Sequence, residues 1–145
     1  MQKMTPCTAI AAAALATGLA VAPAAFADSV KFKASLKGSE EVPPAQSSGT
    51  GTLDATYDTA SKQLTYTVDY SGLTGNATAA HFHGPAEAGK NAGVVVPVQG
   101  SVASPIKGSA TLTDTQAADL MAGKWYFNVH TEANKGGEIR GQVTK

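Results

Sequence analysis

The amino-acid sequence predicts an all-β protein, an antiparallel β-sandwich or barrel with one short connecting helix. Apolar and polar residues alternate over most of the chain after residue 28, and this period of two indicates strands with one buried face. Gly, Pro, Asn and Asp separate the alternating segments, and many short strands bounded by turns are typical of sandwiches and barrels. Only one segment carries the signals of a helix, and that segment is short.

The strands can be placed in chain order. The first covers 29–36, where Phe32 and Leu36 alternate with lysines and serines. Segments 53–57 and 64–70 follow, and the five residues between them (58–62) predict a hairpin. Further strands are expected at 77–83, 94–98, 109–112, 125–130 and 139–143.

Two local signals refine this plan. Pro97 lacks a backbone donor, so its strand is expected at an edge of the sheet or to end there. Thr113 and Gln116 have the T-x-x-Q spacing of a capping box, which satisfies free amide groups at the start of a helix. Gly123 suits the end of that helix, which is therefore expected to connect two strands.

The first 27 residues have the pattern of a secretory signal peptide. Lys3 precedes an apolar stretch rich in alanine, and Ala25-Phe26-Ala27 is a small-x-small cleavage motif. We expect cleavage after Ala27, no stable membrane insertion afterwards, and a secreted or periplasmic domain at 28–145. The single cysteine, Cys7, lies in the signal segment, so the domain is expected to fold without disulfides.

Charge and composition exclude some functions. The chain has 11 basic and 11 acidic residues, whereas nucleic-acid-binding domains normally carry a basic excess. No serine lies in a nucleophile-elbow pattern. Glu40-Glu41 lies in a proline-rich loop and is expected to be solvated. Arg140 is expected to pair with Glu138 or with a loop carboxylate.

The three histidines form a candidate metal site. His81 and His83 are two residues apart in a predicted strand, so their side chains project from the same face. In the strand 125–130 the core face belongs to Trp125, Phe127 and Val129, which places His130 on the opposite face. If the two strands are neighbours, the three imidazoles converge.

Three nitrogen ligands suit copper or zinc. Asn128 or Glu132 is expected to orient a ring from behind. The alternative is that these histidines are ordinary surface residues that anchor the glycine-rich loops.

Four segments between Phe32 and Val143 carry a family resemblance. They are FKASLKGSEEVPP, LTYTVDYSGL, AAHFHGPA and LMAGKWYFNVHTEANKGGEIRGQV. Together they resemble the CHRD (chordin-type) domain family. The resemblance implies an immunoglobulin-like β fold and a single CHRD domain over 28–145. It implies no particular reaction. We therefore expect an exported, non-catalytic binding module whose partner is a protein or an envelope ligand.

A second resemblance is limited to the histidine strands. HFHG and Val129-His130 are similar to copper-ligand strands of copper/zinc superoxide dismutases. The bridging and zinc-ligand histidines of that family have no counterpart in this chain. A metal-dependent copper or zinc enzyme is therefore the alternative to a plain binding module.

Overall fold

The fold is described from a computed structural model that covers residues 27–145. The predicted signal peptide lies outside the described residues except for Ala27. Within residues 27–145 the structure has eight strands, one 3-10 turn and one α-helix: β1 (Ser29–Lys37), η1 (Gly38–Glu40), β2 (Thr50–Asp58), β3 (Gln63–Ser71), β4 (Ala77–His83), β5 (Val94–Pro97), β6 (Ile106–Thr111), α1 (Asp114–Met121), β7 (Trp125–Thr131) and β8 (Ile139–Val143).

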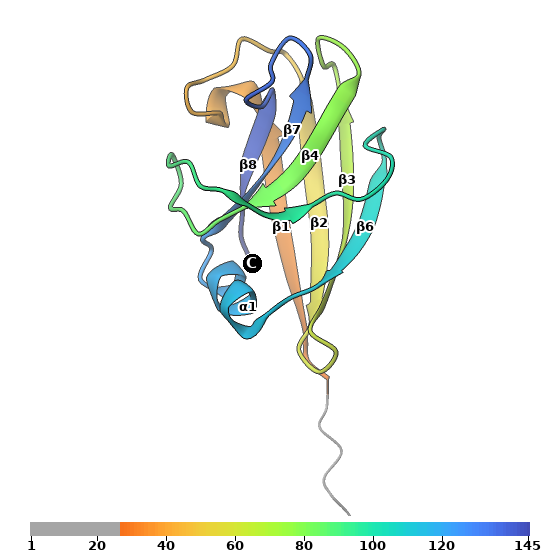
Figure 1. The fold of residues 1–145 in the computed structure, drawn as a ribbon, viewed down its shortest axis with the longest axis vertical. Helices are drawn as coiled ribbons and strands as arrows, with labels where there is room; N and C mark the ends of the chain where they lie inside the picture. Colours follow the sequence, from red (N-terminus) through yellow and green to blue (C-terminus); the bar gives the residue numbers. More distant parts are fainter. Residues whose placement is uncertain (1–26) are drawn as a thin grey trace, which may run out of the picture.

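All eight strands belong to one antiparallel sheet. Its order is β5-β4-β7-β8-β1-β2-β3-β6, and the sheet curls into a nearly closed barrel (Figure 1). The predicted all-β antiparallel class is confirmed, in the form of a barrel-like sheet. Pro97 ends β5, which is an edge strand, as its missing donor predicts.

The inside of the barrel is filled by the apolar residues of the period-two pattern. Phe82 and Phe127 pack at 4.8 Å between ring centroids, and Tyr66 contacts Phe82 edge-on at 5.0 Å. Such edge-to-face pairs add to the free energy gained by burying apolar area. Trp125 and Leu36 are likewise fully buried. The core therefore holds these strands together without any disulfide.

The helix and the last predicted strands also agree with the sequence, with one difference in bounds. Thr113 and Gln116 form the predicted capping box of α1. Strand β6 begins at Ile106, earlier than expected, because Ile106 is buried and pairs with Val68. Gly108 interrupts the alternation there, since the ring of Tyr66 occupies the place of its missing side chain. No helix within residues 27–145 has the length and apolar character needed to cross a membrane.

Loops cover the outer face of the barrel over β7, β8 and the end of β4. On β7 the side chains of both faces are buried from Trp125 to Val129, although only one face points into the core. The segments 38–49 and 84–93 supply this cover. The outward side chains of β4, β7 and β8 thus lie in a polar layer between the sheet and these loops.

A buried carboxylate fastens this layer. Glu138 is fully buried and accepts hydrogen bonds from Ser47 Oγ at 2.7 Å, Thr131 Oγ1 at 2.6 Å, and the backbone N and Oγ1 of Thr74, both at 2.8 Å. Burial alone would raise the pKa of Glu138, but these hydrogen bonds outweigh it and lower the pKa from 4.5 to about 2. The ionised side chain therefore joins two loops to β7.

Replacing Glu138 by Gln should destabilise the protein in a pH-dependent way. Because the folded-state pKa lies below the ordinary value, the stabilisation is present above pH 4.5 and is lost as the pH falls from 4.5 towards 2. At pH 7 we expect the free energy of unfolding in urea to fall by about 2 kcal/mol, the scale of hydrogen bonds to a charged group. At pH 3 the difference from wild type should be smaller.

Glu132→Gln is the control for this measurement. Glu132 is exposed and forms only a surface ion pair with Lys135, so its replacement should change the stability by less than about 1 kcal/mol. An equal loss for Glu138→Gln at pH 7 and pH 3 would contradict the assigned role of the carboxylate.

Candidate metal centre

The candidate centre is built on two neighbouring strands. Strands β4 and β7 pair directly, with His81 opposite Asn128 and His83 opposite Tyr126. His81 and His83 project from the outer face, because Phe82 between them fills the core. His130 projects from the same outer face, since Val129 is buried in the core. The predicted convergence of the three histidines is confirmed.

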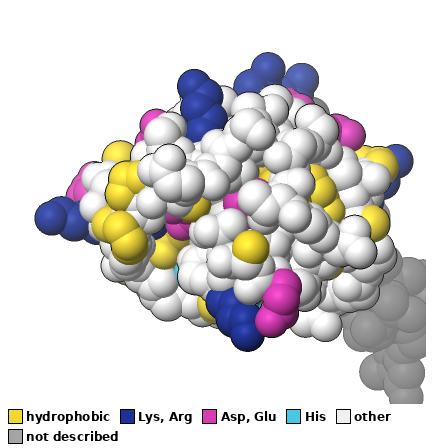
Figure 2. Space-filling model, turned by 90° about the horizontal axis from the view of Figure 1, so that it is seen from above, with side chains coloured by type: hydrophobic (Ala, Val, Ile, Leu, Met, Phe, Trp, Pro, Cys, Tyr) yellow, Lys and Arg dark blue, Asp and Glu magenta, His cyan; other side chains and the backbone are white. Residues whose placement is uncertain are grey.

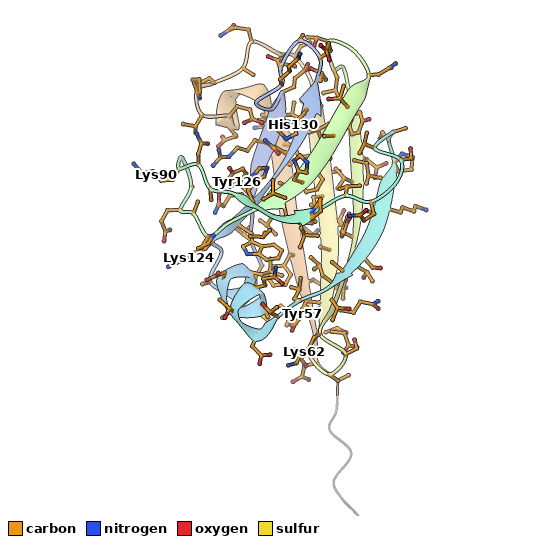
Figure 3. All side chains as sticks on the ribbon, in the orientation of Figure 1. Tyr57, Lys62, Lys90, Lys124, Tyr126 and His130 are labelled. Atoms are coloured by element: carbon orange, nitrogen blue, oxygen red, sulfur yellow. The ribbon has the colours of Figure 1, made fainter. Side chains whose placement is uncertain are left out.

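The ring nitrogens are close enough to share one ion. One nitrogen of each ring lies within 4.8 Å of the others, and His81 Nδ1 is 3.1 Å from His130 Nε2. His83 is buried, whereas His81 and His130 are partly buried. Figure 3 shows His130 and Tyr126 in the part of the barrel away from the end marked by Tyr57 and Lys62, with Tyr126 towards the loop that carries Lys90. Seen from above in Figure 2, almost no histidine surface is visible.

Two of the rings face oxygen acceptors at both nitrogens. His83 Nδ1 is 3.0 Å from Ala92 O, and its Nε2 is 2.9 Å from Asn128 Oδ1. His130 Nδ1 is 2.8 Å from Lys135 O, and its Nε2 is 2.9 Å from the same Asn128 Oδ1. A neutral imidazole has only one N–H. Each ring therefore lacks one hydrogen for its two oxygen neighbours, and a cation between the rings would remove both conflicts.

Protonation is a poor way to supply the missing hydrogen of His83. Burial lowers the pKa of His83, and the charges of His130 and Arg140 act in the same direction, against hydrogen bonds with Ala92 and Asn128. Burial and the neighbouring His130 and His83 lower the pKa of His81. Near neutral pH these two rings are therefore uncharged and able to act as metal ligands.

The two predicted supporting residues have different places. Asn128 is 2% exposed and lies between His83 and His130. Glu132 points into solvent and pairs with Lys135 Nζ at 3.0 Å. Asn128 therefore belongs to the cluster by contact, and Glu132 is turned away from it.

Two residues outside the predicted metal site, Tyr126 and Arg140, hold the cover over the rings. The Tyr126 ring stacks on His83 at 4.7 Å between centroids with an interplanar angle of 2°. Arg140 Cζ lies 3.4 Å from the centroid of the same ring. Because β7 lies between β4 and β8, His83 and Arg140 cover opposite faces of Tyr126. This stack fixes the plane of His83.

The same residues bind the loop 84–93. Arg140 donates hydrogen bonds to Asn91 Oδ1 at 2.7 Å and to Lys90 O. The Tyr126 hydroxyl donates to Ala92 O and accepts from Ala92 N, both at 3.1 Å. The carbonyl that orients His83 is therefore itself held in place. Arg140 forms no ion pair with Glu138 within residues 27–145, contrary to one of the two expected pairings.

The expectation that Glu41 is solvated is wrong. Its side chain is 5% exposed, and its Oε1 is buried without a hydrogen-bond partner among the described residues. Burial raises the pKa of Glu41 to about 7, although the Arg140 charge and the Asn128 amide act to lower it. Of the pair Glu40-Glu41, only Glu40 is exposed. The loop cover removes Glu41 from water, and the spacing of residues gives no sign of this.

Comparison with known families identifies the domain. The model of the CHRD domain family matches residues 32–143. The chain belongs to the CHRD domain family. No curated protein and no solved structure matches it. The histidine cluster lies entirely within the matched CHRD segment.

Two consecutive glycines of this CHRD domain, Gly136 and Gly137, lie next to the site. A Cβ on Gly137 would lie 2.2 Å from Glu41 Oε1 and 2.6 Å from Asn128 Nδ2, and Gly137 has φ +126°. A side chain is therefore excluded there on both steric and backbone grounds. Its neighbour Gly136 has nothing within 4 Å of the same position.

Gly137→Ala should accordingly destabilise the CHRD domain, whereas Gly136→Ala should not. We expect a loss of about 1–3 kcal/mol for Gly137→Ala, the usual cost of a strained backbone conformation, with added displacement of Glu41 and Asn128. Urea unfolding of both variants measures the difference. Equal stabilities of the two variants would show that Glu41 and Asn128 do not require the bare backbone of Gly137.

Proposed function

We propose that this CHRD domain is an exported, non-catalytic binding module that holds one copper or zinc ion through His81, His83 and His130. The observation that carries the proposal is the shortage of hydrogens in the cluster. His83 and His130 each face two oxygen acceptors with a single N–H.

The backbone carbonyls favour one arrangement of these hydrogens. When Ala92 O and Lys135 O accept from the two Nδ1–H groups, both Nε2 atoms point lone pairs into the cluster. An Nδ1–H bound to a carbonyl with Nε2 directed at the ion is a common support of histidine ligands. The third nitrogen, His81 Nδ1, lies beside His130 Nε2. Imidazole nitrogens suit both zinc and copper.

Binding is better supported than catalysis. A metal-dependent enzyme needs a general acid or base near the ion. Within residues 27–145, Glu87 and Glu132 are exposed and pair weakly with Lys124 and Lys135. The buried Glu41 lies behind Asn128, on the side of Gly137. None of these carboxyl groups lies beside the histidine nitrogens, so the superoxide dismutase-like alternative has less support.

The partner and the location of the module follow from the same proposal. Residues 1–27 direct export, and β1 begins at Ser29, just after the proposed cleavage site. The partner is a protein or a component of the cell envelope. Pull-down from an envelope extract with the metal-loaded and metal-free forms would identify it.

The metal site is tested by titrating the purified chain with Cu²⁺ and Zn²⁺ in competition with a chelator. Cys7 is replaced by Ser throughout, because a thiolate would bind copper by itself. Wild type should bind one ion per chain at pH 7.5. Each of the variants His81→Ala, His83→Ala and His130→Ala should bind the ion at least tenfold more weakly, since two imidazoles hold an ion poorly.

Glu132→Gln is the matched control and should bind as wild type does. Calorimetry and metal content of the isolated complexes give independent readouts. No metal uptake by wild type, or equal metal uptake by wild type and His83→Ala, would contradict the proposal. These residues would then be histidines that only anchor the loops.

A further inference from the structure

We propose that the side-chain oxygen of Asn128 is a fourth ligand of the ion, so that the protein itself completes the coordination. This inference rests on the proposed metal binding by the three histidines. It assigns a donor role to a residue whose predicted role was only to orient a ring.

Asn128 lies at the centre of the cluster. It pairs with His81 across the strands and has Tyr126 and His130 as its neighbours on the same face of β7. Its Oδ1 is 2.9 Å from His83 Nε2 and 2.9 Å from His130 Nε2. The two nitrogens that lack hydrogens therefore face one common oxygen, which also lacks a hydrogen to offer.

The surroundings fix the orientation of the amide. Its Nδ2 faces Gly136 O at 3.5 Å. The carboxyl of Glu41 is on the same side, since a Cβ placed on Gly137 would lie 2.2 Å from Glu41 Oε1 and 2.6 Å from Asn128 Nδ2. Gly136 O can only accept, and the Glu41 carboxylate accepts when it is ionised. With Glu41 ionised, the NH₂ group belongs on that side, and the oxygen is left to face the histidines.

The separations suit a four-coordinate ion. Ligands about 2.0–2.2 Å from a tetrahedral zinc are about 3.3 Å from one another. The two distances from Oδ1 are 2.9 Å, and His81 Nδ1 to His130 Nε2 is 3.1 Å. The three histidine nitrogens together span up to 4.8 Å, so one ring has to move closer when the ion binds. His81 is partly buried, so a small rotation of its ring can bring its nitrogen into place.

A set of three nitrogens and one oxygen has a consequence for metal choice. Soft sulfur ligands favour Cu⁺, whereas imidazole and oxygen donors suit divalent ions. The site should therefore prefer Cu²⁺ and Zn²⁺ to Cu⁺. Because Asn128 is 2% exposed, its oxygen fills the coordination position that a water molecule would otherwise take.

The test compares exchangeable water at the ion in wild type and in Asn128→Ala, both full-length chains with Cys7→Ser and loaded with Cu²⁺. Pulsed electron paramagnetic resonance in D₂O detects deuterons of a directly bound water. Asn128→Ala should gain one such water relative to wild type and lose at least tenfold in Cu²⁺ affinity.

Asn128→Asp separates a donor from a mere hydrogen-bonding residue, and it keeps the test intact if the alanine variant does not fold. It is made together with Glu41→Gln, so that an amide N–H and not a second carboxylate faces the new carboxylate oxygen. The aspartate retains a donor oxygen and adds a negative charge, so Cu²⁺ should bind at least as tightly as in wild type, with no added water. Weaker binding by Asn128→Asp, or an alanine variant with unchanged affinity and water signal, would overturn the inference while metal binding by the histidines stands. Absence of Cu²⁺ binding by wild type itself would instead remove the proposed function.

Glu41 is assigned as the positioning residue for this amide. Glu41→Gln keeps an acceptor oxygen for Asn128 Nδ2 and should behave as wild type. Glu41→Leu removes that acceptor, so the amide is free to turn and the ion should gain the same exchangeable water as in Asn128→Ala. A Glu41→Leu complex with the wild-type water signal would contradict the positioning role.

Discussion

The site depends on one property of imidazole, which is that the neutral ring has a single N–H. His83 and His130 each lie between two oxygen acceptors. In an exposed cluster, water would satisfy the nitrogens that lack a hydrogen. Here His83 is buried and His130 is partly buried, so water reaches these nitrogens poorly. A cation between the rings would remove the conflict, which is the basis of the proposed metal site.

The cover is held by a small number of hydrogen bonds that also orient the rings. Ala92 O accepts from His83 and from Tyr126, and Tyr126 lies between His83 and Arg140. On the other side, the four hydrogen bonds of Glu138 join two loops to β7. Among the described residues, Glu41 Oε1 is the one buried side-chain atom of this polar layer without a hydrogen-bond partner. A buried polar group without a partner costs free energy, so its presence in such a layer calls for an explanation.

Much of this was predictable from the sequence, because period-two alternation directly reports which side of a strand is buried. It placed His81, His83 and His130 on one face, and the structure brings them together. The loop cover was not predictable, since nothing in local spacing states which loop folds over which strand. Glu41 was therefore expected in solvent. One signal was available: Trp125 to Val129 carries bulky or amide side chains on both faces, which is typical of a strand buried on both sides. Glu132 was a reasonable candidate from its position two residues after His130, but it lies beyond the end of β7 and turns to Lys135.

The most direct test of this account is the hydrogen position on the two rings in the metal-free protein. Long-range ¹H–¹⁵N correlation spectra of the ¹⁵N-labelled protein at pH 7.5 distinguish the tautomers. The account predicts that His83 is neutral, and that both His83 and His130 carry a hydrogen at Nδ1, with the Nε2 side of each ring directed into the cluster. A ring that carries its hydrogen at Nε2 alone, or a His83 ring with hydrogens on both nitrogens at this pH, would contradict the claim that the fold prepares these nitrogens for a metal ion.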